Sequence, residues 1–120
     1  MSNRVFVVQR PAYRDRASGE WITKYDLRPA EEFGKLVDVL PHNMFWDADT
    51  IVAQAERILE NFNPHEDYIL AIGDPVAIAT VGIVAYKSGG PVTVLKWDKK
   101  AQCYQPFCIH LSSFKKIAGA

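Results

Sequence analysis

The chain has 120 residues and a formal net charge of zero, and 48% of its residues are hydrophobic. This length suits one domain with a single core, and the apolar content excludes a disordered chain. Residues 1–28 carry six Lys or Arg and three acidic residues, residues 29–67 carry two and nine, and residues 68–120 carry six and two. We therefore expect a polarised surface, but not a protein that depends on overall positive charge to bind polyanions.

No apolar stretch approaches the roughly 18 residues of a membrane span, and the first residues lack a signal-peptide pattern. Cys103 and Cys108 lie five residues apart within one expected strand. An odd spacing places them on opposite faces, so we expect free thiols rather than a disulfide. These features predict a cytoplasmic protein.

The first third of the sequence predicts strands. Residues 5–9 are β-branched and aromatic, and residues 20–27 form a second strand after a polar loop. We expect these two strands to pair as a hairpin. A short connection over residues 29–34, with room for one helical turn, leads to a third strand at residues 35–40.

Two helices are predicted further along the chain. The first begins at a cap, either Asp47 or Asp49, and its apolar residues recur at helical spacing to about Phe62. The second has Asp74 as its N-cap and Pro75 as its first residue, and continues to about residue 88. It is apolar almost all round, which indicates a helix covered on two sides or placed in an oligomer interface.

The remaining strands are expected at residues 68–72, 92–97 and 103–111, with a flexible basic tail at residues 112–120. The order is β-β-β-α-β-α-β-β. It predicts a single α/β domain over residues 1–120, with a mixed sheet of about six strands. The middle β-α-β-α-β should be parallel, and the flanking hairpins antiparallel.

The turn Gly73-Asp74-Pro75 joins a buried strand to a helix, a place where α/β proteins often hold anions. However, the Asp74 carboxylate repels a phosphate, and Pro75 lacks an N–H group. We therefore favour a structural role: a sharp turn, a cap and a helix start. The alternative is a small ligand or nucleotide at the carboxyl ends of the parallel strands. The candidate residues for that site are Gly73, Asp74, His42, Trp97 and Asp98.

Motifs for catalysis or cofactors are not evident. The sequence has no glycine-rich phosphate loop, no serine-nucleophile elbow and no histidine or cysteine spacing typical of a metal site. We therefore expect no metal and no cofactor, and we favour a binding protein over an enzyme.

Cations and aromatic residues alternate in the expected N-terminal hairpin, a pattern that can bind nucleic acid. The candidates are Arg10, Tyr13, Arg14, Arg16 and Trp21. The nearby acidic residues Asp15, Glu20 and Asp26 weaken the positive field, so nucleic-acid binding should be weak at most.

An apolar cluster, Met44, Phe45 and Trp46, precedes the first helix. It is either a hydrophobic staple for that helix or an exposed contact surface for a protein partner, since Trp and Met are enriched at interfaces.

Two segments carry a family resemblance. "DYILAIGDPVAIA" fits D-Y-[IL]-L-x-x-G-D-P-x-A-[IL], and "VTVLKWD" fits V-x-x-L-[KR]-W-D. In these the chain resembles small proteins of unassigned function from bacterial phages and integrated mobile elements, over about residues 36–111. The resemblance implies a mobile-element origin and a bacterial cytoplasm, and transfers no catalytic residue.

The sequence therefore favours a non-enzymatic α/β module of phage type that binds another protein, such as a host factor, or a second copy of itself. A ligand site near Asp74 ranks second, and nucleic-acid binding by the hairpin ranks third.

Overall fold

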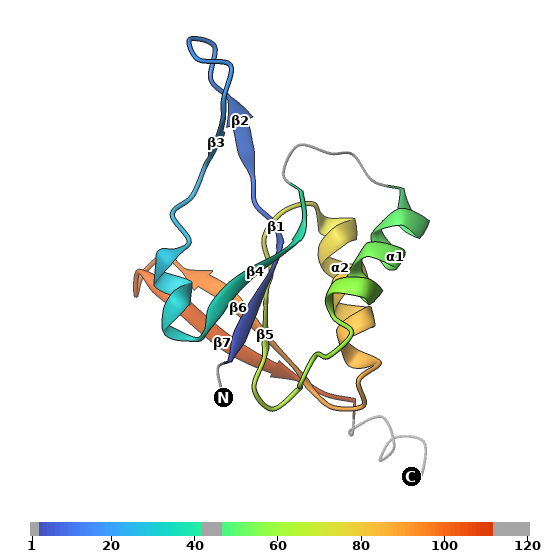
Figure 1. Ribbon diagram of the computed structural model, residues 1–120. Coiled ribbons are helices and arrows are strands. Elements are labelled where there is room, and N and C mark those ends of the chain that lie inside the picture. Colours follow the sequence, from blue (N-terminus) through green and yellow to red (C-terminus); the bar gives the residue numbers. More distant parts are fainter. Residues whose placement is uncertain (1–2, 42–46, 112–120) are drawn as a thin grey trace.

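The computed structural model, which describes residues 3–41 and 47–111, has a five-stranded sheet at its centre (Figure 1). Across the sheet the strands are β4 (Lys35–Leu40), β1 (Arg4–Gln9), β5 (Tyr68–Leu70), β6 (Val92–Asp98) and β7 (Cys103–Ile109). The first four are parallel, and β7 is antiparallel to β6. The predicted α/β class, the mixed sheet and the parallel middle strands are confirmed.

The hairpin predicted between residues 5–9 and 20–27 is wrong. Strand β1 instead lies between β4 and β5, with Val5 opposite both Leu36 and Tyr68. The antiparallel hairpin consists of two shorter strands, β2 (Ala12–Arg14) and β3 (Trp21–Thr23), which form a separate sheet that projects from the body (Figure 1). The reason is burial: Val5 to Val8 are all buried, and a strand apolar on both faces belongs at the centre of a covered parallel sheet.

The helices begin where the sequence predicts. Asp47 caps α1 (Ala48–Ile58) by accepting a hydrogen bond from the backbone N–H of Thr50 at 2.8 Å. Helix α2 (Pro75–Tyr86) follows its cap, Asp74. The short connection contains the single turn η1 (Arg28–Glu32). Helix α1 is shorter than expected, although Phe62 beyond it is still buried.

Both helices lie on one face of the sheet (Figure 1). Their core cluster joins the inner faces of the helices to side chains of the strands beneath them, and includes Phe6, Val8, Ile69 and Val92 from the sheet and Ile51, Ala55, Ala77 and Val81 from the helices. The opposite face carries a smaller cluster covered by η1 and the residue before it, and includes Val5, Val7, Leu70, Leu95, Tyr104, Leu27 and Ala30. This thinner cover leaves room for cavities on the face without helices.

Asp67 connects three parts of the chain from a buried position. Its side chain is 2% exposed and pairs with the Arg4 guanidinium at 2.8 Å. It also accepts hydrogen bonds from the backbone N–H of Arg4 at 3.1 Å and of Asn63 at 2.8 Å. The start of β1, the turn after α1 and the start of β5 are thereby fixed to one carboxylate.

Helix α2 is apolar all round but is not covered all round. Val81 is buried and Ile78 and Val84 are half-buried, as the sequence predicts. On the outer face Val76 is 57% and Ile83 is 69% exposed. The helix therefore has a buried face, two partly covered flanks and an open apolar stripe.

Two substitutions in α2 test this division. Ile78→Asp places a charge beside the helix-side core and should lower the free energy of unfolding by a few kcal/mol. Ile83→Asp places the same charge in solvent and should leave it nearly unchanged. Urea unfolding followed by circular dichroism gives both values. Equal destabilisation by the two variants would contradict the orientation described for α2.

Candidate functional site

The turn Gly73-Asp74-Pro75 is packed tightly against the end of β1. Gly73 has φ of +111°, and a Cβ atom there would lie 2.6 Å from the Gln9 carbonyl oxygen. The Gln9 N–H donates to the Ile72 carbonyl at 3.1 Å, which holds the two segments together. A side chain at residue 73 would therefore collide with backbone, so glycine is required by packing.

Asp74 has a helix-capping contact. Its carboxylate accepts a hydrogen bond from the Ala77 N–H at 3.0 Å, and Pro75 occupies the first helical position. These contacts support the structural interpretation of the turn, because the cap already occupies an N–H group that an anion would need.

A cavity of about 650 Å³ lies at the carboxyl ends of β5 and β6, and we call it the strand-end cavity. Trp97 and Tyr104 stand opposite each other on β6 and β7, with their rings edge to face at 5.0 Å. Tyr104 and Leu70 belong to the cluster on the face without helices, so the cavity is on that face. Its lining residues are Tyr25, Asp26, Pro29, Leu70, Ala71, Ile72, Lys96, Trp97, Lys99 and Tyr104.

Some charged side chains around the strand-end cavity are already paired within the protein, and others are available to a ligand. Side-chain hydrogen bonds from Arg28 hold the pKa of Asp26 at about 2, so this carboxylate stays ionised and paired. Burial, and to a lesser degree Asp26, raise the pKa of Tyr104, which keeps its phenol neutral. Lys96 and Lys99 are exposed, and neither forms an ion pair with residues 3–41 or 47–111. The cavity therefore offers positive charge to a ligand.

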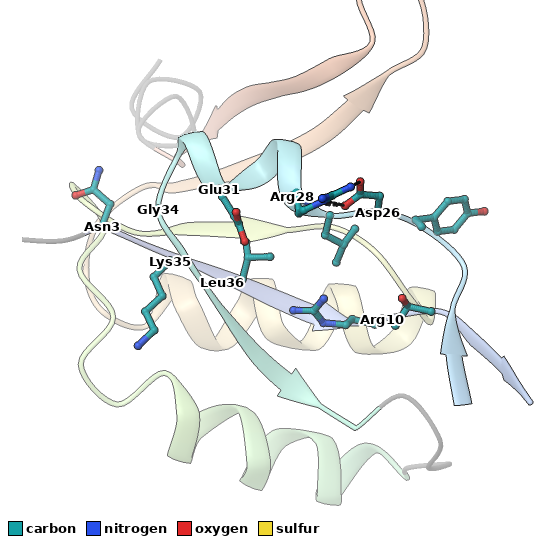
Figure 2. Close-up of a pocket in the computed structure, with 11 residues that line it drawn as sticks. Asn3, Arg10, Asp26, Arg28, Glu31, Gly34, Lys35 and Leu36 are labelled. Atoms are coloured by element: carbon teal, nitrogen blue, oxygen red, sulfur yellow. Dashed lines mark hydrogen bonds and ion pairs between the residues drawn. The ribbon is translucent and has the colours of Figure 1, made fainter. Parts of the chain in front are cut away.

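A second cavity, of about 640 Å³, lies between η1 and β4 and shares Tyr25 and Asp26 with the first (Figure 2). Figure 2 shows Arg28 beside Asp26 and, below them, Arg10 from the end of β1. Arg10 donates to the Asp38 carboxylate at 2.7 Å, and Arg28 does so to Asp26 at the same distance. Both arginines that line this second cavity are thus already paired. The second cavity is therefore a poorer site for a charged ligand than the strand-end cavity.

The hairpin residues do not gather on one surface. Arg14 is opposite Trp21 in the register of β2 and β3, whereas Tyr13 is opposite Ile22 on the other face of the ribbon. The Arg14 guanidinium donates to the Gly19 carbonyl at 3.1 Å within the hairpin. Arg10 lies outside the ribbon, beside Asp38.

An apolar surface extends from α2 to the edge strand β7, and we call it the α2–β7 surface. Phe107 and Ile109 stand opposite Val94 and Val92, which pack under the helices, so they point to the helix side of the sheet. Phe107 is 52% and Ile109 is 51% exposed. The Tyr86 hydroxyl accepts a hydrogen bond from the Leu111 N–H at 3.2 Å and joins the two elements. The surface consists of Val76, Ala79, Ile83, Phe107, Ile109 and Leu111.

The predicted site residues are separated by the fold. Trp97 lines the strand-end cavity, whereas Gly73 and Asp74 do not. Asp98 shapes the turn after β6, since its carboxylate accepts from the Lys100 N–H at 2.9 Å and the Ala101 N–H at 3.1 Å. His42 and the cluster of Met44, Phe45 and Trp46 lie outside the described residues.

Sequence reasoning missed most of the strand-end cavity. Lys96 and Lys99 lie at the end of a predicted strand. They could have been predicted, because ligands of parallel sheets bind outside the carboxyl ends of the strands. Tyr25 and Asp26 could not, because the sequence places them inside a strand that in fact ends at Thr23.

The described residues have neither a metal-binding cluster nor a membrane-spanning helix. In residues 3–41 and 47–111 no three His, Cys, Asp or Glu residues are grouped closely enough to hold a metal ion. In the same part of the chain, no helix has the length and hydropathy needed to cross a membrane.

The comparisons with known proteins place the chain among phage proteins. The family model of the phage Pam3 gp32-like protein matches residues 3–111. The chain belongs to this family. Neither the curated proteins nor the solved structures include a significant match. The resemblance to small phage proteins is thereby confirmed at the level of the family, while the two sequence motifs remain an observation on this chain.

The cap at Asp74 gives a stability test of the turn. Asp74→Ala removes the acceptor for the Ala77 N–H and should cost about 1 kcal/mol of unfolding free energy, and Asp74→Asn should restore most of it. Urea unfolding of the three proteins measures this. Unchanged stability in Asp74→Ala would mean that the carboxylate serves something other than the helix.

Proposed function

We propose that this phage-type protein is a non-enzymatic module that binds another protein through the α2–β7 surface. The observation that carries the proposal is the exposure of Ile83, which is 69% exposed in the middle of an apolar helix. Contiguous apolar side chains on a small protein are typical of contact surfaces, because solvent exposure of such a patch is unfavourable.

The shape of the surface supports a partner rather than isolated exposed residues. Helix α2 is bounded on one side by the pair between Lys87 and Glu56 of α1, at 2.7 Å, and on the other by Tyr86, which reaches Leu111. The stripe from Val76 to Ile83 lies between these sides. Gly82 faces open space, since a Cβ atom there would meet nothing within 4 Å. An apolar helix or strand of a partner fits such a step between a helix and a sheet edge.

Surface variants test the proposal. Ile83→Asp and Phe107→Asp should each weaken partner binding by at least about tenfold, as expected for hot-spot residues. Candidate partners are the proteins encoded by the neighbouring genes, purified and measured pairwise by biolayer interferometry. Ile22→Asp, an exposed apolar residue on the hairpin, is the matched control and should retain binding.

Two further measurements complete the design. Circular dichroism should show the same melting for all three variants, since the substituted side chains are exposed. Light scattering of the protein alone identifies self-association: a dimer that Ile83→Asp dissociates would assign the surface to a second copy. Full binding by both surface variants would contradict the proposal.

A second candidate function is the binding of a small ligand in the strand-end cavity. Its location supports this, because ligands of parallel α/β sheets bind outside the carboxyl ends of the strands. Its volume, about 650 Å³, is within the usual range of ligand sites. The site would use Trp97 and its neighbours rather than Asp74.

Nucleic-acid binding by the hairpin is a third candidate, with low expected affinity. Arg14 and Arg16 offer two charges, and Arg14 already contacts Gly19. Mobility shifts with single- and double-stranded DNA and RNA at low salt should show weak binding at most. Tight binding that falls steeply with salt, and that the double substitution Arg14→Ala with Arg16→Ala removes, would move this candidate to first place.

A further inference from the structure

Tyr104 is a buried side chain whose hydroxyl has no partner among the residues that the structure describes. The residue is 8% exposed and lines the strand-end cavity. Its hydroxyl forms no hydrogen bond with any residue in the ranges 3–41 and 47–111. Buried tyrosine hydroxyls usually have a partner, because an unpaired polar group in an apolar setting is unfavourable. The hydroxyl is therefore a donor that a molecule in the cavity can use.

The walls of the cavity suit a flat ring. Trp97 and Tyr104 form an aromatic corner with centroids 5.0 Å apart, and Leu70 and Ile72 contribute an apolar floor. Tyr25 from the segment before η1 adds a third ring to the lining. Aromatic side chains bind planar heterocycles by stacking or edge contacts, which are worth about 1–3 kcal/mol for a nucleic-acid base.

The charged side chains around the cavity determine whether a cationic or an anionic ligand is favoured. Asp26 would attract a cation, but its carboxylate is held by the Arg28 guanidinium at 2.7 Å. Lys99 is exposed, lines the cavity and forms no ion pair with the described residues, and Lys96 adds a second positive charge at the same strand end. A cationic ring would be repelled by these ammonium groups, whereas an anionic group would be bound by them.

We infer that the strand-end cavity binds a small flat aromatic ligand with an anionic group, the chemistry of a nucleoside monophosphate. The ring lies in the corner of Trp97 and Tyr104, the Tyr104 hydroxyl donates to an acceptor on the ligand, and Lys99, in the turn after β6, binds the anion. This inference rests on the second candidate function and names its ligand class. It does not involve the α2–β7 surface, which is on the helix side of the sheet.

Titration of the full chain with AMP, monitored by amide chemical shifts in NMR spectra, tests the inference. We expect saturable shifts at Leu70 to Ile72 and Lys96 to Lys99, and a shift of the Trp97 indole N–H. Lys99→Glu should weaken binding at least about fivefold, because it removes a charge-assisted contact. Lys100→Glu makes the same charge change one residue further along, where the side chain does not line this cavity. It should leave the affinity within about twofold at physiological salt. Tyr104→Phe should weaken binding about fivefold with unchanged melting, since it deletes only the hydroxyl.

Further probes separate the ligand class from the site. Adenosine, which lacks the anion, should bind more weakly than AMP, and inorganic phosphate and the cationic ring tryptamine should not bind. If adenosine or tryptamine shifts the cavity amides while AMP does not, the ligand class is wrong and the second candidate function stands. If none of the four probes shifts these amides, both are wrong. Equal weakening by Lys99→Glu and Lys100→Glu, or tighter binding of a single-stranded oligonucleotide than of AMP at these residues, would also overturn the inference.

Discussion

The buried Asp67 carboxylate is the contact on which the arrangement of the sheet depends. It accepts hydrogen bonds from the backbone N–H and the guanidinium of Arg4 and from the backbone N–H of Asn63. A buried carboxylate without such donors is unfavourable by several kcal/mol. The N-terminal strand therefore lies beside β5, in register with Tyr68, and the turn that follows α1 is held against both. With β1 fixed there, β4 can pair only on its other side and becomes an edge strand.

This order places both helices on one face and leaves the other to η1 and the segment before it. The division has a functional consequence. Residues 25–28 cross the thinly covered face and separate two cavities that share Tyr25 and Asp26. The helix face instead has an apolar stripe on α2 beside an edge strand. A ligand and a protein partner would therefore approach from opposite sides, and neither would block the other.

Local patterns were sufficient to predict most elements, because each has a local cause. Asp47 and Asp74 cap helices through contacts within three residues. The uniform apolar character of α2 predicted a helix with more than one covered or contact-forming side. The pairing of β1 was not predictable from neighbouring residues, since its partners Leu36 and Tyr68 are distant in sequence. The same limit hid the strand-end cavity. Tyr25 lines this cavity together with Trp97 and Tyr104 only because the chain crosses the sheet, and Asp74, predicted as a candidate for that site, instead caps its own helix.

The central position of β1 also determines when the sheet can form during synthesis. Strand β1 is made before its two partners, β4 on one side and β5 on the other, and Val7 is paired with both Asp38 and Leu70. At about 5–20 residues per second the ribosome takes several seconds to supply β5. During that time the segment Val5 to Val8, which is fully buried in the native state, lacks its second neighbouring strand and the helices that cover it. A central strand that is translated before both of its partners thus leaves an apolar segment of the nascent chain uncovered until β5 has left the ribosome.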